Sequence, residues 1–216
     1  MPCVNAVIVD YGLGNIFSIQ RAVTHLGADP VISSDHETIL GADRLILPGV
    51  GSFGGGMQGL RAKGLVDVIN AYVETGKPML GICLGMQLLM SRSEEFGEHE
   101  GLNLIPGDVI RFPSPVPRGL QYKIPHVGWN SIEPVTGRAF GNWEGTNLSD
   151  NQPGDFVYFV HSYRVIPKDR VYVLAETEYG GHRFCSVVVK DNICGCQFHP
   201  ELSGEVGLKI YDQFLK

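Results

Sequence analysis

A lone cysteine stands between two glycines in residues 79–90, which read MLGICLGMQLLM. The apolar residues before Cys83 suit a buried parallel strand, and those after it suit a helix. In a G-x-C-x-G turn the glycines let the backbone bend sharply, so the cysteine projects from the top of the sheet. Ligands of open α/β sheets bind outside the carboxyl ends of the strands. The turn therefore predicts a reactive Cys83, with a small buried cysteine as the alternative from this segment alone.

Strand-like and helix-like stretches alternate through the first hundred residues. Apolar runs predict strands at 4–9, 31–32, 44–47 and 78–82. Apolar residues at helical spacing predict helices at 16–26, 65–73 and 84–90. Asn15 is expected to cap the first helix and Gly27 to end it. Such alternation predicts an α/β fold: a doubly wound mixed sheet with helices on both faces.

The second half of the chain is richer in strands. Strand-like runs occur at 108–111, 155–160, 171–176, 184–190 and 193–197. A hairpin turn is expected at Asp191 and Asn192 between the last two runs. A final helix is predicted over 205–214, with Ser203 as its N-cap. We interpret residues 1–216 as a single domain, with a parallel core, a more antiparallel second half and a return to the core.

Composition and charge limit the kinds of partner. The 216 residues are 44% apolar and 19% charged, and the net charge is −6 with no basic block. This argues against nucleic acid or an anionic membrane as the main partner. The five cysteines lack the spacing of a secreted disulfide framework, and Cys194 and Cys196 are expected to be packed rather than metal-bound. With no signal-peptide pattern and no membrane-length apolar run, the expectation is a cytoplasmic protein.

A second segment, QFHPE at residues 197–201, supplies an imidazole and a carboxylate. Residues two apart on extended chain share a face, so His199 and Glu201 can point the same way. Pro200 stops the strand from continuing. Glu201 can then accept the Nδ1–H of His199 and leave Nε2 free to face a thiol. The pair ends an apolar run, which makes a surface histidine beside a solvated glutamate the weaker alternative.

A third segment, residues 47–56, is rich in glycine and also follows a strand. It lacks the G-x-G-x-x-G register that opens a helix and the Walker lysine, which argues against a nucleotide loop. A backbone donor for an oxyanion beside Cys83 fits it better. A flexible turn is the alternative that this segment alone leaves open.

With these three elements in place, the chain resembles the class I (triad-type) glutamine amidotransferases. The resemblance runs nearly end to end, through the segments Asp10–Asn15, Pro48–Gly51, Gly81–Gln87, Pro125–Asn130, Phe159–Tyr163 and Phe198–Glu201. Within that family it is strongest to the glutaminase subunits of histidine biosynthesis. The family fold is the doubly wound α/β sheet already expected.

The resemblance implies a role for each matching residue. Cys83 would be the nucleophile, His199 the acid and base, and Glu201 its orienter. The oxyanion hole would use the backbone N–H of Leu84 with one from Val50 or Gly51. The amino-acid end of glutamine would be held by Gln87, Ser162, Tyr163 and the backbone near Gly49. Asn15 and Trp129 match positions that face a partner subunit, and no cofactor or metal is implied.

The implied reaction is hydrolysis of L-glutamine to glutamate and ammonia. The ammonia would pass to a (β/α)8-barrel cyclase or synthase subunit, the heterodimer partner, which makes imidazole glycerol phosphate and an aminoimidazole carboxamide ribotide. Leu202 departs from the lysine that usually follows His-Pro-Glu in this family. The departure keeps open a paralogous subunit that feeds sugar amidation in surface-polysaccharide synthesis. A stand-alone γ-glutamyl thiol hydrolase and a non-catalytic binding protein with a vestigial pocket are the further alternatives.

Overall fold

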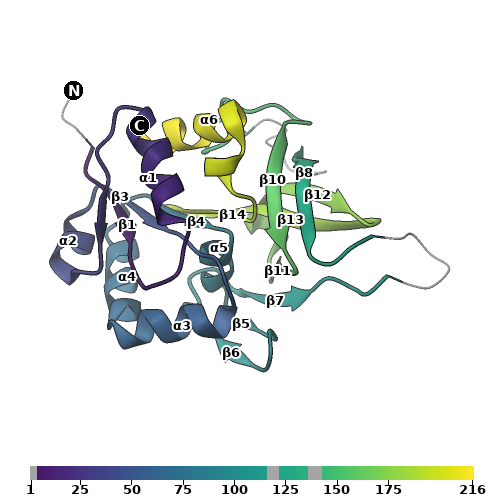
Figure 1. The fold of residues 1–216 in the computed structure, drawn as a ribbon, viewed down its shortest axis with the longest axis horizontal. Helices are drawn as coiled ribbons and strands as arrows, with labels where there is room; N and C mark the ends of the chain where they lie inside the picture. Colours follow the sequence, from purple (N-terminus) through teal and green to yellow (C-terminus); the bar gives the residue numbers. More distant parts are fainter. Residues whose placement is uncertain (1–3, 116–121, 136–142) are drawn as a thin grey trace.

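A mixed sheet of eight strands forms the centre of the protein. The structure is a computed structural model that describes residues 4–115, 122–135 and 143–216. Across the sheet the strands are β2 (Val31–Ser33), β1 (Ala6–Val9), β3 (Arg44–Leu47), β4 (Met79–Ile82), β14 (Ile193–Cys196), β13 (His182–Lys190), β12 (Val173–Tyr179) and β9 (Glu133–Pro134). The strands from β2 to β14 are parallel, and the pairs beyond them are antiparallel (Figure 1).

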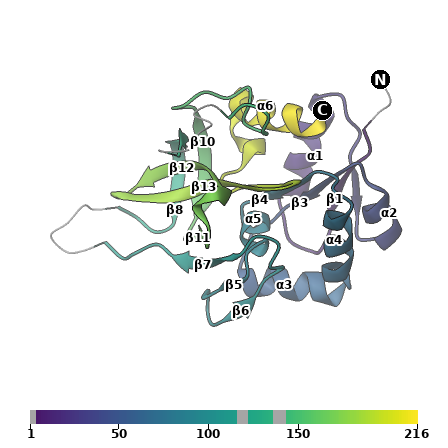
Figure 2. The same ribbon diagram turned by 180° about the vertical axis from the view of Figure 1, so that it is seen from behind.

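Helices cover both faces of this sheet, as Figures 1 and 2 show from opposite sides. One face carries α1 (Ile16–His25) and α6 (Gly204–Leu215). The other carries α2 (His36–Gly41), α3 (Phe53–Ala62), α4 (Leu65–Glu74) and α5 (Leu84–Leu88). Within β1, Ile8 packs with the first set and Val7 with the second, so the continuous apolar run is buried on both sides. The predicted doubly wound α/β class is confirmed.

The predicted return to the core is also confirmed. Strand β14 lies between β4 and β13, parallel to β4 and antiparallel to β13. Lys190 pairs with Ile193, so the hairpin turn contains the two residues that were expected, and Asp191 has a positive φ of 51°. Because β4 and β14 are parallel neighbours, their carboxyl ends lie side by side, and the segments that follow them meet there.

Two smaller sheets pack beside the carboxyl end of the core. One pairs β10 (Phe156–His161) with β8 (His126–Ser131). The other runs β11 (Tyr163–Pro167), β7 (Gly107–Arg111), β5 (Arg92–Ser93) and β6 (His99–Glu100). The remaining elements are two 3₁₀ turns, η1 (Arg170–Tyr172) and η2 (Pro200–Leu202). Among the described residues, no helix is long and apolar enough to cross a membrane.

The glycine-rich segment after β3 is not all loop. Helix α3 begins at Phe53, and the hydroxyl of Ser52 caps it by accepting from the N–H of Gly55 at 3.3 Å. The helix was missed because glycine disfavours helices in isolation. Its glycines serve close packing: a Cβ on Gly59 would lie 2.5 Å from the carbonyl oxygen of Tyr11.

Asn15 and Ser203 occupy the N-cap positions of α1 and α6 as predicted, but their side chains do not cap these helices. Asn15 reaches Glu201 instead, and the hydroxyl of Ser203 donates to the carbonyl of His199 at 2.7 Å. Tertiary partners around the segment 199–203 have replaced the local ones.

Candidate active site

Cys83 occupies a sharp turn between β4 and α5. Its backbone has φ 53° and ψ −108°, a conformation that costs a non-glycine residue about 1–3 kcal/mol. The N–H of Cys83 donates to the carbonyl of Cys196 at 2.7 Å, which fastens the turn to β14. A Cβ on Gly85 would lie 1.9 Å from the carbonyl oxygen of Leu47. The glycine is therefore required by the close passage of β3, as the sequence pattern predicted.

His199 and Glu201 follow β14 and come together as predicted, but by another backbone route. Nδ1 of His199 lies 2.8 Å from Oε1 of Glu201, and the two side chains are 2% and 0% exposed. Extended chain was expected here, whereas Pro200 begins the 3₁₀ turn η2. Two further donors reach the carboxylate of Glu201: Nδ2 of Asn15 at 3.5 Å and the hydroxyl of Tyr211 at 3.4 Å.

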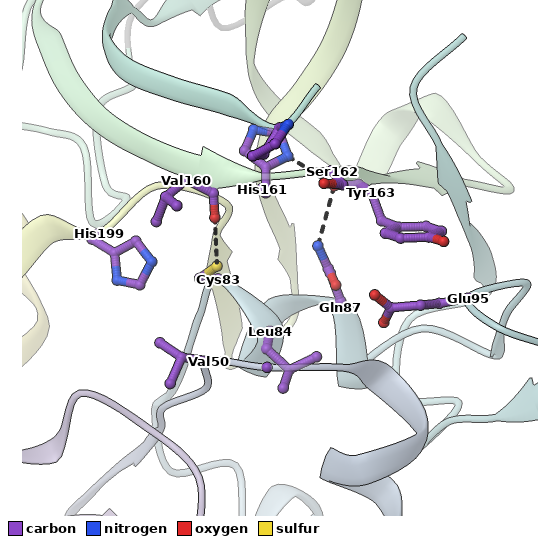
Figure 3. Close-up of a pocket in the computed structure, with 12 residues that line it drawn as sticks. Val50, Cys83, Leu84, Gln87, Glu95, Val160, His161, Ser162, Tyr163 and His199 are labelled. Carbon is purple, nitrogen blue, oxygen red and sulfur yellow. Dashed lines mark hydrogen bonds between the residues drawn. The ribbon is translucent and has the colours of Figure 1, made fainter. Parts of the chain in front are cut away.

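The other ring nitrogen of His199 is available to Cys83. Nε2 is buried without a hydrogen bond to any described residue, and the ring lies next to the sulfur in Figure 3. Burial alone would lower the pKa of His199, but the thiolate of Cys83 and the carboxylate of Glu201 outweigh it and raise that pKa to about 10. The pKa of His199 therefore lies above neutral pH, and its ring stands between Cys83 and Glu201.

A cavity of about 350 Å³ opens over the sulfur. It is lined by Val50, Gly51, Cys83, Leu84, Gln87, Glu95, Pro125, Val160, His161, Ser162, Tyr163 and His199 (Figure 3). The sequence prediction included eight of these residues, and it missed Glu95, Pro125, Val160 and His161. The predicted nucleophile, base, oxyanion segment and substrate-binding side chains therefore line the same cavity.

The segment 48–51 presses against the nucleophile turn. A Cβ on Gly49 would lie 2.6 Å from Cβ of Leu84 and 2.7 Å from the backbone nitrogen of Gly85. The hydroxyl of Tyr11 donates to the carbonyl of Pro48 at 2.6 Å and anchors the segment from below. Gly49 itself is packed behind the cavity, while its neighbours Val50 and Gly51 line it.

Two polar side chains form the far wall of the cavity. Nε2 of Gln87 donates to the carbonyl of Tyr163 at 3.2 Å and to Oε1 of Gln197 at 3.1 Å. The carboxylate of Glu95 points into the cavity in Figure 3, and one of its oxygens accepts from the N–H of Phe53 at 2.5 Å. Glu95 was missed because it lies in a polar, glutamate-rich stretch with no recognisable spacing.

The two residues predicted to face a partner lie in different settings. Trp129 is 55% exposed on β8, where its ring packs edge-on against Tyr158 of β10. Asn15 is only half-buried and contacts Glu201, so it lies against the triad as well as near the surface. Leu202, which directly follows Glu201, is 40% exposed.

Comparison with known proteins places this geometry in a family. The family model "Glutamine amidotransferase class-I" matches residues 7–216. The chain belongs to the class-I glutamine amidotransferases. The chain is 47% identical over 209 residues to the "Imidazole glycerol phosphate synthase subunit HisH 1" of Legionella pneumophila (strain Paris), covering 97% of each chain. It is 46% identical to subunit HisH of Aquifex aeolicus (strain VF5), covering 96% of this chain and 94% of that one.

Solved structures with the same fold are more distant in sequence. "Structure of PurLQS from Thermotoga maritima" matches with a TM-score of 0.73 at 21% identity, over 99% of this chain and 98% of that one. "Crystal structure of glutamine amidotransferase" matches with a TM-score of 0.69 at 20% identity, over 97% of both chains. These matches concern the fold alone and agree with the α/β architecture of this amidotransferase.

The remaining cysteines of this amidotransferase that the structure describes are structural. Cys185, Cys194 and Cys196 are at most 5% exposed, which confirms the prediction that the C-x-C pair is packed. No group of three or more metal-ligating side chains occurs in residues 4–115, 122–135 and 143–216. Cys3 lies outside the described residues.

Proposed function

We propose that this chain is the glutaminase subunit of an imidazole glycerol phosphate synthase, hydrolysing glutamine and passing the ammonia on for histidine biosynthesis. The observation that carries the proposal is the buried arrangement of His199 between Cys83 and Glu201, beside one cavity. Identity of 46–47% over nearly the full length to subunits with that printed name supports the pathway. We further propose that residues 1–216 form one glutaminase domain.

The reaction starts from an ion pair. With His199 protonated, the thiolate of Cys83 attacks the side-chain amide carbon of glutamine. The carbon–nitrogen bond of the resulting tetrahedral intermediate breaks as His199 gives its Nε2 proton to the departing nitrogen. Ammonia leaves, and a γ-glutamyl thioester remains on Cys83. His199 then takes a proton from water, the hydroxide attacks the thioester, and glutamate leaves as the carbon–sulfur bond breaks.

The cavity walls supply the other requirements of this reaction. Backbone N–H groups of Leu84 and of Val50 or Gly51 are the proposed donors to the oxyanion, because both segments line the cavity at the sulfur. The two Nε2 hydrogens of Gln87 are already used within the protein, which leaves its Oε1 to meet substrate. Glu95 and Gln87 are the proposed acceptors for the α-ammonium of glutamine, with Ser162 and Tyr163 completing that end of the cavity.

An apolar surface next to the cavity supports a partner subunit. Val127 pairs with Val160, and Trp129 with Tyr158, in the register of β8 and β10. Residues two apart on a strand share a face, so this face presents the exposed side chains Val127, Trp129, Phe156 and Val160. Val160 also lines the cavity. A contiguous exposed apolar surface of this kind is typical of a protein interface.

The proposed occupant of that surface is the synthase subunit, with a (β/α)8-barrel as its fold. Ammonia released into water at neutral pH becomes ammonium, which is not a nucleophile. The site that uses the ammonia must therefore be shielded from bulk water together with the glutaminase site. The names of the relatives favour histidine biosynthesis over the polysaccharide pathway despite Leu202. An apolar Leu202 also matches an apolar interface.

The test uses the complex with the synthase subunit. Cys83→Ala should abolish glutamine-dependent synthesis of imidazole glycerol phosphate and leave synthesis from added ammonium salt intact. Wild-type chain should release glutamate faster with the liganded synthase subunit than alone. Loss of the ammonia-dependent reaction in Cys83→Ala would show that Cys83 is structural. Equal glutamate release with and without the partner would refute the coupling.

A further inference from the structure

A buried glutamine touches the sulfur of Cys83. Nε2 of Gln197 lies 3.8 Å from Sγ, within the reach of an N–H···S hydrogen bond, and the residue is fully buried. The backbone of Gln197 is held by a 2.9 Å hydrogen bond from its N–H to the carbonyl of Ser186. Besides the ring of His199, one further polar group contacts the sulfur among the described residues: the carbonyl oxygen of Val160, at 4.0 Å.

The orientation of the Gln197 amide follows from its neighbours. Amide oxygen and nitrogen are similar in size, so their placement must come from the hydrogen-bond network. The carbonyl of Tyr163 can only accept, which requires the nitrogen of Gln87 to face it. The second hydrogen of that nitrogen points at Gln197, which must therefore present its oxygen. The nitrogen of Gln197 is left to face Sγ of Cys83.

The contacts of the sulfur with Val160 and with Gln197 favour opposite protonation states. A carbonyl oxygen such as that of Val160 can accept from a thiol S–H but repels a thiolate. An N–H donor stabilises the thiolate, and more strongly in a buried site than in water. A buried charge without such a donor is costly. Gln197 is thus the side-chain amide that satisfies the anionic sulfur before substrate enters.

We propose that Gln197 is a further catalytic residue, whose amide N–H stabilises the thiolate of Cys83 and whose orientation is fixed by Gln87. The proposal rests on the proposed function for its catalytic consequence, and on the hydrogen-bond geometry for its effect on the sulfur. Besides substrate contact, Gln87 then has a second role, which is to orient the amide of Gln197. Without Gln87, the amide of Gln197 is free to turn its oxygen toward the sulfur.

The experiment measures the alkylation of Cys83 by iodoacetamide in the full-length protein from about pH 5 to about pH 10. Mass spectrometry of the Cys83 peptide excludes the other cysteines. Gln197→Met keeps the length and removes the donor. Gln197→Glu keeps an acceptor for Gln87 but presents a negative oxygen to the sulfur. The midpoint of alkylation should rise by about one pH unit in Gln197→Met, lowering the rate at neutral pH about tenfold, and by more in Gln197→Glu.

Gln87→Leu provides an independent arm, because Gln87 contacts Gln197 and not the sulfur. Its midpoint should rise as well. Asn151→Leu is the matched control: that buried amide donates to Asp155 and to the carbonyl of Val206, away from the cavity. It should lower stability without moving the midpoint.

A wild-type midpoint in Gln197→Met would overturn the proposal and leave Gln197 as packing. If Gln197→Met does not fold, a wild-type midpoint in Gln87→Leu overturns it equally. The proposed function fails by a different result: wild-type chain that alkylates normally but releases no glutamate with the synthase subunit. The two failures are therefore distinguishable.

Discussion

Two buried neutral histidines should make this protein lose stability in mild acid. His126 and His161 are 2% and 6% exposed, and Nδ1 of His126 lies 3.2 Å from Nε2 of His161. Nδ1 of His161 donates to the carbonyl of Tyr163 at 2.8 Å, so its Nε2 is the acceptor for His126. Burial lowers the pKa of His126 from 6.5 to about 4 and that of His161 to about 3.

The sign of the effect follows from which state binds protons. Below pH 6.5 the unfolded chain protonates both residues, while the folded protein keeps both neutral until about pH 4. The contribution of this pair to stability is therefore highest above the unfolded pKa and falls as the pH falls, whereas the raised pKa of His199 contributes in the opposite direction. Between about pH 7 and about pH 5.5, each histidine lowers the free energy of unfolding by about 1.2 kcal/mol, so the pair lowers it by about 2.5 kcal/mol. This loss hardly depends on how far below 5.5 each folded pKa lies.

The assay is urea unfolding at the two pH values, for wild type and for His126→Phe. The aromatic ring of phenylalanine fits between Phe159 and Tyr179, which stack on His126 at ring-centroid distances of 4.7 and 3.8 Å. Over the same pH interval, the decrease in the free energy of unfolding should be smaller by about 1.2 kcal/mol in the variant than in wild type. His25→Gln, at an exposed histidine of α1, serves as the control. An equal loss in wild type and His126→Phe would refute the reasoning.

Two further predictions concern turnover. Tyr211→Phe removes a hydrogen-bond donor to Glu201 that is worth about 1 kcal/mol, so kcat for glutamate release should fall about fivefold with KM unchanged. The control is Tyr72→Phe, which removes a buried hydroxyl elsewhere and should leave kcat unaltered. Gly49→Ala forces a Cβ into the nucleophile turn and should lower glutamine-dependent kcat at least about tenfold without affecting the ammonia-dependent reaction. Gly41→Ala is the control, because a Cβ at position 41 would have open space around it. Equal effects of the two substitutions would contradict the argument that a Cβ at position 49 displaces the nucleophile turn.

Local sequence patterns predicted the parallel half of the scaffold and the meeting of Cys83 with the pair His199 and Glu201. Apolar runs located the parallel strands, and the residues around Cys83 and His199 placed both at strand ends. Parallel strands bring such ends together, so the meeting of the two segments follows from topology. Helices α2 and α3 and strands β5, β6, β8, β9 and β11 were not predicted. In α3 the glycines have a packing role that the neighbouring Tyr11 and Leu88 explain.

Side-chain partners distant in sequence could not be predicted. Asn15 and Ser203 occupy the N-cap positions that local patterns predicted, but their side chains donate to the segment 199–203 and do not accept from the helix N–H groups. Gln197 meets Gln87 across 110 residues, and no spacing rule connects them. Glu95 enters the cavity from a polar stretch whose path depends on the small sheet around β5. Each of these contacts is decided by packing rather than by propensity.

One carbonyl oxygen connects the chemistry to the surface where a partner would dock. Tyr163 accepts from both His161 and Gln87, so the same atom fixes the tautomer of the histidine pair and the orientation of the glutamine pair. His161 ends β10, whose opposite face carries the exposed Val160 beside the cavity. The proposed partner surface therefore lies next to the strand end whose hydrogen bonds hold the amide of Gln87.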